Sequence, residues 1–127
     1  MSGKLLLDTN IILGFLRGHE AVVKYLQAHE GHEWYASVIT RMELLSFHSL
    51  EKEDENAVQE FLGTVIIVPL SPEVEDMAIR LRRATRRKMP DAIVAASAVV
   101  SGAMLVTKDR ELAATDFFGL MTHNPNE

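Results

Sequence analysis

The 127-residue chain contains no cysteine. That absence excludes a disulfide framework, a thiolate zinc site and a cysteine nucleophile, so any catalysis must depend on other side chains. A chain without cysteine also fits a reducing compartment, and we predict that the protein is cytoplasmic.

Long hydrophobic runs are missing as well. The longest uncharged run, 92–107, has sixteen residues and is interrupted by Gly102, whereas a membrane-spanning helix needs about 20 apolar residues. Near the N-terminus only three leucines separate Lys4 from Asp8, too few for the apolar region of a signal peptide. We therefore expect no membrane segment and no targeting signal.

Basic residues are in the minority. The 13 lysines and arginines face 18 acidic residues, which gives a formal net charge of −5. This balance argues against a strongly basic nucleic-acid-binding protein. Length and even composition predict one domain that spans residues 1–127.

Short apolar segments alternate with helical patterns along the chain. Strands are predicted at 4–7, 33–39, 64–68, 103–106 and 120–121. Helices are predicted at 11–16 and 21–28, and a third begins at Thr40. A fourth follows the charged run 51–55 and passes through 61–62. Further helices are predicted at 72–88 and 91–101, with a short helical turn at 109–114. Strands that alternate with helices are typical of an α/β domain with a parallel sheet, here of four to five strands.

Four acidic residues fall at related places in this pattern. Asp8 ends the first strand and Asp109 follows the fourth, while Glu43 and Asp91 lie in the first turns of two helices. Ligands of open parallel sheets bind at the carboxyl ends of the strands. Four carboxylates gathered there would repel one another, and a hard divalent cation such as Mg²⁺ or Mn²⁺ would relieve that repulsion. The pattern therefore favours a carboxylate metal site of the kind that hydrolyses phosphodiesters.

Each acid also has a structural interpretation. Glu43 could complete a capping box with Thr40, Asp91 could favour the positive end of its helix, and Asp109 could cap the turn after it. Asp8 could be held in an Asx-type turn, although an unpaired carboxylate beside the core is costly. The four acids together favour the metal site more strongly than any one of them alone.

Four motifs follow one another along the chain: LLDTNI at 6–11, SVITRMEL at 37–44, PDAIVAASA at 90–98 and LVTKD at 105–109. In order and spacing they resemble the PIN domain family, and more narrowly the VapC-type toxins of bacterial and archaeal toxin–antitoxin pairs. The resemblance covers nearly the whole chain, although no single motif is specific.

This resemblance implies a three-layer α/β/α fold and a Mg²⁺- or Mn²⁺-dependent endoribonuclease. The implied catalytic and metal-binding residues are Asp8, Glu43, Asp91 and Asp109, with Asn10 and Thr107 in supporting positions. It further implies an RNA substrate, a homodimer or larger toxin–antitoxin assembly, and inhibition by a cognate antitoxin. The alternative is a non-catalytic PIN-like module that binds RNA or protein.

The chain departs from the family pattern at one position. Many relatives carry a further aspartate three residues after the position of Asp109, where this chain has Leu112. The nearest substitute is Asp116, which precedes Phe117. We expect Asp116 to have at most an auxiliary role in the site.

Two surfaces are expected to contact partners. Six of the thirteen basic residues lie within the nine residues 80–88, which contain no acid. They could form a solvated helix end, favoured there by the helix dipole, or a patch that binds RNA phosphates through Arg82, Arg83, Arg86 and Arg87. By family resemblance, an antitoxin groove is expected along the early helices, lined by Ile12, Phe15, Leu16 and Phe47. Trp34 and the phenylalanines in general are expected in the core.

Overall fold

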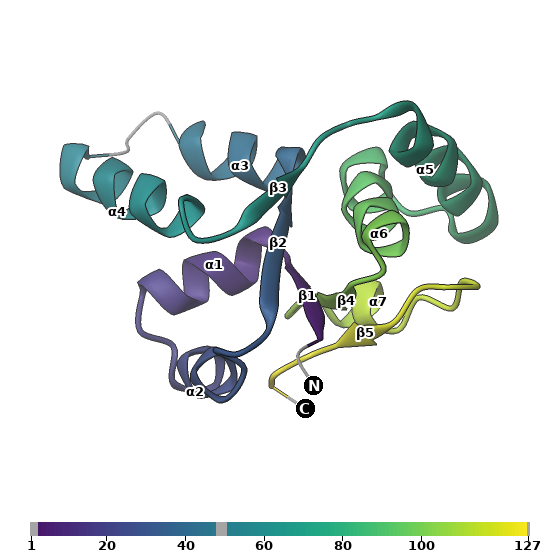
Figure 1. Cartoon of the computed structure of the whole chain (residues 1–127). Coiled ribbons are helices and arrows are strands. Elements are labelled where there is room, and N and C mark those ends of the chain that lie inside the picture. The colour runs from purple at the N-terminus through teal and green to yellow at the C-terminus, as the bar shows by residue number, and fades with distance from the viewer. Residues whose placement is uncertain (1–2, 48–50, 127) are drawn as a thin grey trace.

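Five parallel strands form one sheet in the order β3–β2–β1–β4–β5 (Figure 1). The computed structural model describes residues 3–47 and 51–126. The strands are β1 (Lys4–Leu7), β2 (Glu33–Ser37), β3 (Ile66–Val68), β4 (Met104–Val106) and β5 (Thr122–His123). The chain proceeds outward from β1 to β3 and then returns to pair β4 with the other side of β1. The strand order therefore reverses between β1 and β4, which is where open α/β sheets bind ligands.

Helices cover both faces of the sheet, as the α/β/α prediction required. On one face lie α1 (Thr9–Leu16), α2 (Glu20–Ala28) and α4 (Lys52–Leu62); on the other lie α5 (Pro72–Thr85), α6 (Met89–Ser101) and α7 (Arg110–Ala113). The helix α3 (Val38–Leu45) contacts both α1 and α6. It thereby connects the two helical layers beside the carboxyl end of β2.

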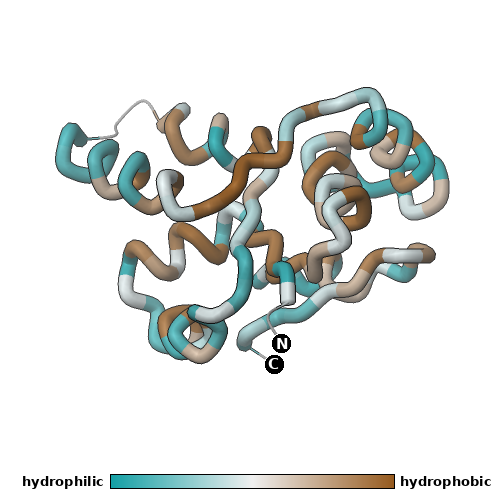
Figure 2. The backbone as a smooth tube through the Cα atoms, in the orientation of Figure 1, coloured by the Kyte–Doolittle hydropathy of each residue, from teal (hydrophilic) through white to brown (hydrophobic). Residues whose placement is uncertain are grey.

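The central strand β1 explains why the core has two halves. Successive side chains of a strand point to opposite faces, so Leu6 packs with α5 and α6 while Leu5 and Leu7 pack with α1, α2 and α4. All three leucines are at most 2% exposed, and burying each contributes roughly 1.5–3 kcal/mol. Figure 2 shows hydrophobic colour along β3 and on α6, and hydrophilic colour on the outer turns of α4 and α5.

The start of α3 differs from the prediction. The strand ends at Ser37, whose Oγ accepts a hydrogen bond from the backbone N–H of Ile39 at 3.1 Å. Ser37 is therefore the N-cap, and Thr40 lies fully buried inside the helix. The predicted Thr40–Glu43 capping box is therefore wrong. Val38 and Ile39 favour a strand by propensity, so the sequence pattern extended the strand past Ser37 and placed the helix start too late.

Other boundaries shift by a few residues. The N-cap Ser71 and the first-turn Pro72 of α5 are confirmed, but the helix ends at Thr85 because Arg86 adopts a left-handed backbone conformation with φ 60°. The last strand lies at Thr122–His123, two residues later than predicted.

Exposure corrects two expectations about apolar residues. Phe118 is 97% exposed, so the prediction that the phenylalanines in general lie in the core is wrong for this residue. Phe47, which was expected to line a partner groove, is 46% exposed. Ile12 is fully buried and cannot line a docking groove. Across the described ranges, no helix combines the length and the apolar character needed to cross a membrane.

Candidate functional site

A pocket of about 470 Å³ lies at the carboxyl edge of the sheet and brings together four acids from four separate segments. The residues that line it are Asp8, Thr9, Asn10, Leu13, Glu43, Ser46, Phe47, Asp91 and Asp109. No lysine or arginine is among them. The pocket is therefore strongly acidic and lies beside the point where the strand order reverses.

Asp8 is the most deeply placed of the acids, with 9% exposure. It follows β1 and caps α1, where its Oδ1 accepts a hydrogen bond from the backbone N–H of Thr9 at 2.8 Å. The Thr107 hydroxyl donates to its Oδ2 at 2.8 Å. Burial raises the pKa of Asp8 above the ordinary value of 3.8, and the negative charges of Asp91 and Glu43 raise it further, against the lowering effect of these hydrogen bonds.

Thr107 and Asn10 join the ends of β1 and β4. Besides donating to Asp8, the Thr107 hydroxyl oxygen accepts from the backbone N–H of Asp109 at 3.1 Å. The Asn10 side chain accepts from the backbone N–H of Lys108 at 3.0 Å, and its amide donates to Asp8 at 3.4 Å. These bonds orient the Asp8 carboxylate and the segment that carries Asp109.

Asp91 lies half-buried in the first turn of α6. Burial raises its pKa, and the charges of Asp109 and Glu43 raise it further, whereas the cations Lys88 and Arg87 act in the opposite direction. Asp91 interacts with Asp109 and Glu43, and Asp8 interacts with Asp91 and Glu43, so the four carboxylates share one electrostatic environment.

Glu43 and Asp109 lie exposed at the rim and are hydrogen-bonded within the protein. The Thr9 hydroxyl donates to Glu43 Oε1 at 2.6 Å. Asp109 Oδ1 accepts from the backbone N–H groups of Glu111 and Leu112 at 2.9 and 3.1 Å, and so caps α7. Accordingly, within the described part of the chain, no three acidic or histidine side chains converge closely enough to hold a metal ion.

The remaining candidate residues lie outside this pocket. Asp116 is exposed and is not among the lining residues, and Leu112, at the position of the missing family aspartate, is buried in the core at 1% exposure. Arg82, Arg83 and Arg86 are exposed on a separate pocket beside α5.

Arg87 differs from the other three arginines. Its Nε donates to the Thr115 hydroxyl at 3.1 Å, and its Nη1 pairs with Glu111 Oε2 at 3.1 Å. Its side chain is only 26% exposed. Arg87 therefore connects the turn after α5 to α7, the short helix capped by Asp109.

Sequence reasoning missed the contact between Thr9 and Glu43. Its hydroxyl holds Glu43, and its backbone N–H holds Asp8, so it links two of the acids. Its place directly after Asp8 at the start of a helix was the available signal, because polar residues there hydrogen-bond to their neighbours. Ser46 and Phe47, at the end of α3, also line the pocket.

An apolar groove lies beside the acidic pocket. Phe15 and Leu16 of α1 line a pocket of about 420 Å³ together with Trp34 and Phe61. A smaller adjoining pocket of about 210 Å³ is lined by Leu16 and Phe47, among others. Three of the four residues expected in a partner groove therefore line these pockets, and the buried Ile12 does not.

The chain matches one protein family and is similar to several solved structures. The PIN domain family model matches residues 5–118. A toxin–antitoxin complex from Klebsiella pneumoniae contains a chain that is 27% identical, with a TM-score of 0.79 over 95% of this chain and 97% of that chain. VapBC2 from Rickettsia felis, solved bound to a DNA fragment from its promoter, has a chain that is 20% identical, with a TM-score of 0.81 over 95% and 98% of the two chains.

A third similar structure is FitAcB from Neisseria gonorrhoeae. Its matching chain is 24% identical, with a TM-score of 0.71 over 95% of this chain and 97% of that one. Among curated proteins, the comparison found no match. The likeness thus extends over almost the full length of each of these solved chains.

Proposed function

The chain belongs to the PIN domain family, and we propose that it is a VapC-type toxin, an endoribonuclease that requires Mg²⁺ or Mn²⁺ and is inhibited by a cognate antitoxin. One observation carries the proposal: Asp8, Glu43, Asp91 and Asp109 line one pocket at the switch point of the sheet, with no basic side chain among them. Oxygen ligands of this kind suit a hard divalent cation.

The electrostatics of the pocket fit such a cation. The pKa values of both Asp8 and Asp91 are raised, in part by neighbouring carboxylates. A bound cation would remove that repulsion and favour the ionised carboxylates. Glu43 would have to turn from Thr9 to become a ligand, and it is exposed enough to do so.

Each residue of the pocket has a distinct part in this proposal. Mg²⁺ or Mn²⁺, when bound, would orient the scissile phosphate, activate water and neutralise the developing charge. Asp8 offers a carboxylate fixed by Thr107, and Asp91 offers a second from the start of α6. Asp109 uses Oδ1 to cap α7, which leaves Oδ2 to orient the attacking water and accept its proton. Attack by that water breaks the bond between phosphorus and the 3′ oxygen, which takes up a proton from solvent, and leaves a 3′-hydroxyl and a 5′-phosphate.

The partner proposal rests on the solved structures. The similar chain from Klebsiella pneumoniae was solved as part of a toxin–antitoxin complex. We expect this chain likewise to act in the cytoplasm as a homodimer, or in a larger assembly, with the antitoxin seated on the groove formed by Phe15, Leu16 and Phe47.

Cleavage of labelled RNA by the purified protein tests the activity. We expect cleavage with Mg²⁺ or Mn²⁺, none with EDTA, and none in Asp8→Asn or Asp91→Asn. Asp76→Asn is the matched control, because Asp76 is exposed on α5 away from the pocket. Metal-dependent cleavage that persists in both pocket variants would refute the site, and its absence in the wild type would favour the non-catalytic alternative. Sequencing of RNA ends after controlled expression would then identify the target.

Co-purification with the small protein encoded next to this gene tests the groove. Leu16→Asp places a charge in the groove and should abolish co-purification. Val100→Asp is the control, because Val100 is an exposed apolar residue near the end of α6. Equal recovery of the partner with both variants would place the antitoxin elsewhere.

A further inference from the structure

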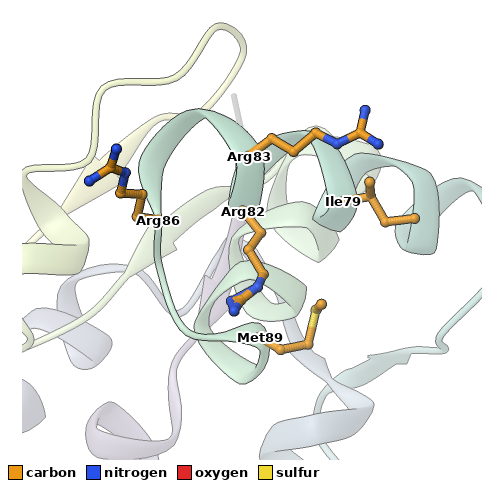
Figure 3. Close-up of a pocket in the computed structure, with 5 residues that line it drawn as sticks. All are labelled: Ile79, Arg82, Arg83, Arg86 and Met89. Carbon is orange, nitrogen blue, oxygen red and sulfur yellow. The ribbon is translucent and has the colours of Figure 1, made fainter.

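We propose that the pocket beside α5 and the start of α6, which is separate from the acidic pocket, is a binding site for single-stranded RNA. The site is about 440 Å³ and is lined by Ile79, Arg82, Arg83, Arg86 and Met89 (Figure 3). The guanidinium groups would contact phosphates, and the two apolar side chains would contact a base. The inference rests on the proposed function for its substrate, but its RNA-binding test does not depend on cleavage.

The three arginines lack the partners that surface arginines usually have. Among the described residues, no carboxylate forms an ion pair with Arg82, Arg83 or Arg86. The interaction found for this set is a 3.4 Å hydrogen bond from Arg82 Nη1 to the backbone carbonyl of Arg87. By contrast, Arg87 is paired with Glu111. Three unpaired cations around one pocket repel one another and favour an anionic ligand.

The floor of the pocket is apolar and accessible. Ile79 is 45% exposed and Met89 is 42% exposed. Figure 3 shows the Arg82 side chain extending toward Met89, while Arg83 and Arg86 extend away from it on either side. Single-stranded nucleic acid carries both features that this arrangement matches, a charged backbone and apolar base faces. Duplex phosphates alone would leave the two apolar residues without a partner.

The backbone of Arg86 is a second, independent feature. It is the one residue other than glycine that has a positive φ among those described, at 60°. Glycine or asparagine usually occupies this position at a helix end, and an arginine there costs about 1 kcal/mol or more in backbone strain. The strained conformation ends α5 and places the Arg86 side chain on the rim of the pocket.

The pocket is well placed to deliver RNA to the acids. Met89 precedes Asp91 by two residues at the start of α6, so the two side chains project from nearly opposite sides of the helix. The strand would pass across a helix end about 10 Å wide, roughly the length of three stacked nucleotides.

Fluorescence anisotropy tests the proposal separately from catalysis. A labelled, mixed-sequence RNA of about 12 nucleotides is titrated with protein in EDTA over a range of NaCl concentrations. The triple variant Arg82→Gln/Arg83→Gln/Arg86→Gln should bind roughly tenfold more weakly, and its salt slope should fall by about two, since each phosphate contact on a single strand contributes about 0.7. The same substitutions to lysine should retain the slope.

Two further variants complete the design. Arg17→Gln/Arg80→Gln is the charge control, because both residues are exposed and neither lines the pocket. Ile79→Gln/Met89→Gln should weaken binding with the salt slope unchanged, as expected for lost base contacts. Thermal melting and sedimentation of every variant establish that folding and oligomeric state are preserved.

The outcomes separate the two proposals. Loss of binding in the triple variant together with retained binding in the control supports the pocket, even if the wild type cleaves no RNA and the proposed function fails. An unchanged salt slope in the triple variant overturns the pocket, even if metal-dependent cleavage is intact. Tighter binding of DNA of the same sequence would overturn the choice of RNA. A change in the oligomeric mass of Ile79→Gln/Met89→Gln without a change in its RNA affinity would overturn the base contact.

Discussion

The Asp8 carboxylate is both nearly buried and hydrogen-bonded. It closes the central strand and is nearly buried, yet it is held by hydrogen bonds from Thr107 and Thr9. Burial and the neighbouring acids nevertheless raise its pKa above 3.8. In the absence of a cation, the ionised site therefore destabilises the folded protein.

This leads to a prediction about pH. The folded protein holds the Asp8 proton to a higher pH than the unfolded chain, so stability falls as pH rises from 3.8 through the raised pKa. Thermal unfolding in EDTA should show this fall, and Asp8→Asn should reduce it. Asp76→Asn should leave the pH profile unchanged. An identical profile for Asp8→Asn and the wild type would contradict the prediction.

Thr107 is a positioning residue, because its hydroxyl orients Asp8 and accepts the amide of Asp109. We predict that Thr107→Val lowers the cleavage rate roughly 10- to 100-fold, as for other residues that orient metal ligands. The free energy of unfolding should fall by about 1–3 kcal/mol, because buried polar groups lose their partner. Thr107→Ser keeps the hydroxyl and should retain most activity; a loss in Thr107→Ser as large as that in Thr107→Val would contradict a role carried by the hydroxyl alone.

At the scale of the element, α7 is the short helix whose position decides where Asp109 lies. Asp109 caps it, and Arg87 ties it to the turn after α5 through Thr115 and Glu111. A four-residue helix has little stability of its own. Its position therefore depends on these contacts and on the buried Leu112.

We predict that Arg87→Gln reduces catalysis more than RNA binding. Loss of the contacts to Thr115 and Glu111 would release α7 and Asp109, so kcat should fall several-fold while RNA affinity changes little. Arg80→Gln, on the exposed side of α5, is the control. A loss of affinity with unchanged kcat would instead make Arg87 an RNA ligand, as the sequence suggested.

At the scale of the whole molecule, the sheet order brings together segments that are far apart in the chain. Asp8 follows β1 and Thr107 follows β4, and these strands are neighbours in the sheet. Glu43 and Asp91 come from α3 and α6, which are in contact. A cation bound between them would stabilise the whole fold.

We therefore predict that Mn²⁺ raises the melting temperature. At a hundredfold excess over the dissociation constant, binding to the folded state adds about 2.7 kcal/mol to stability. The rise should be absent in Asp8→Asn and present in Asp76→Asn. A rise of equal size in Asp8→Asn would indicate that the metal binds elsewhere.

Local features of the sequence were enough for much of this fold. The four-residue apolar run of β1, the Ser71–Pro72 helix start and the alternation of strands with helices all act over short distances, and the structure confirms them. The positions of Asp8, Asp91 and Asp109 at strand and helix ends followed from the same pattern. Glu43 was predicted in the first turn of its helix and instead lies near the end of α3, because that helix begins at Val38. The α3 start was wrong because a strand-forming Val38–Ile39 pair lies in the first turn of a helix capped by the buried Ser37.

The tertiary structure decided what depends on partners distant in the chain. The contacts of the arginines at 82–87 depend on whether another segment lies beside them. Glu111 and Thr115 hold Arg87, whereas Arg82, Arg83 and Arg86 line an open pocket. The hydrogen bonds of Asp8 and Glu43, and the exposure of Phe118, likewise depend on distant segments and could not be predicted from the sequence. Composition and periodicity determine which segments form and which side chains they carry, but contacts between segments follow only from how the sheet orders its strands.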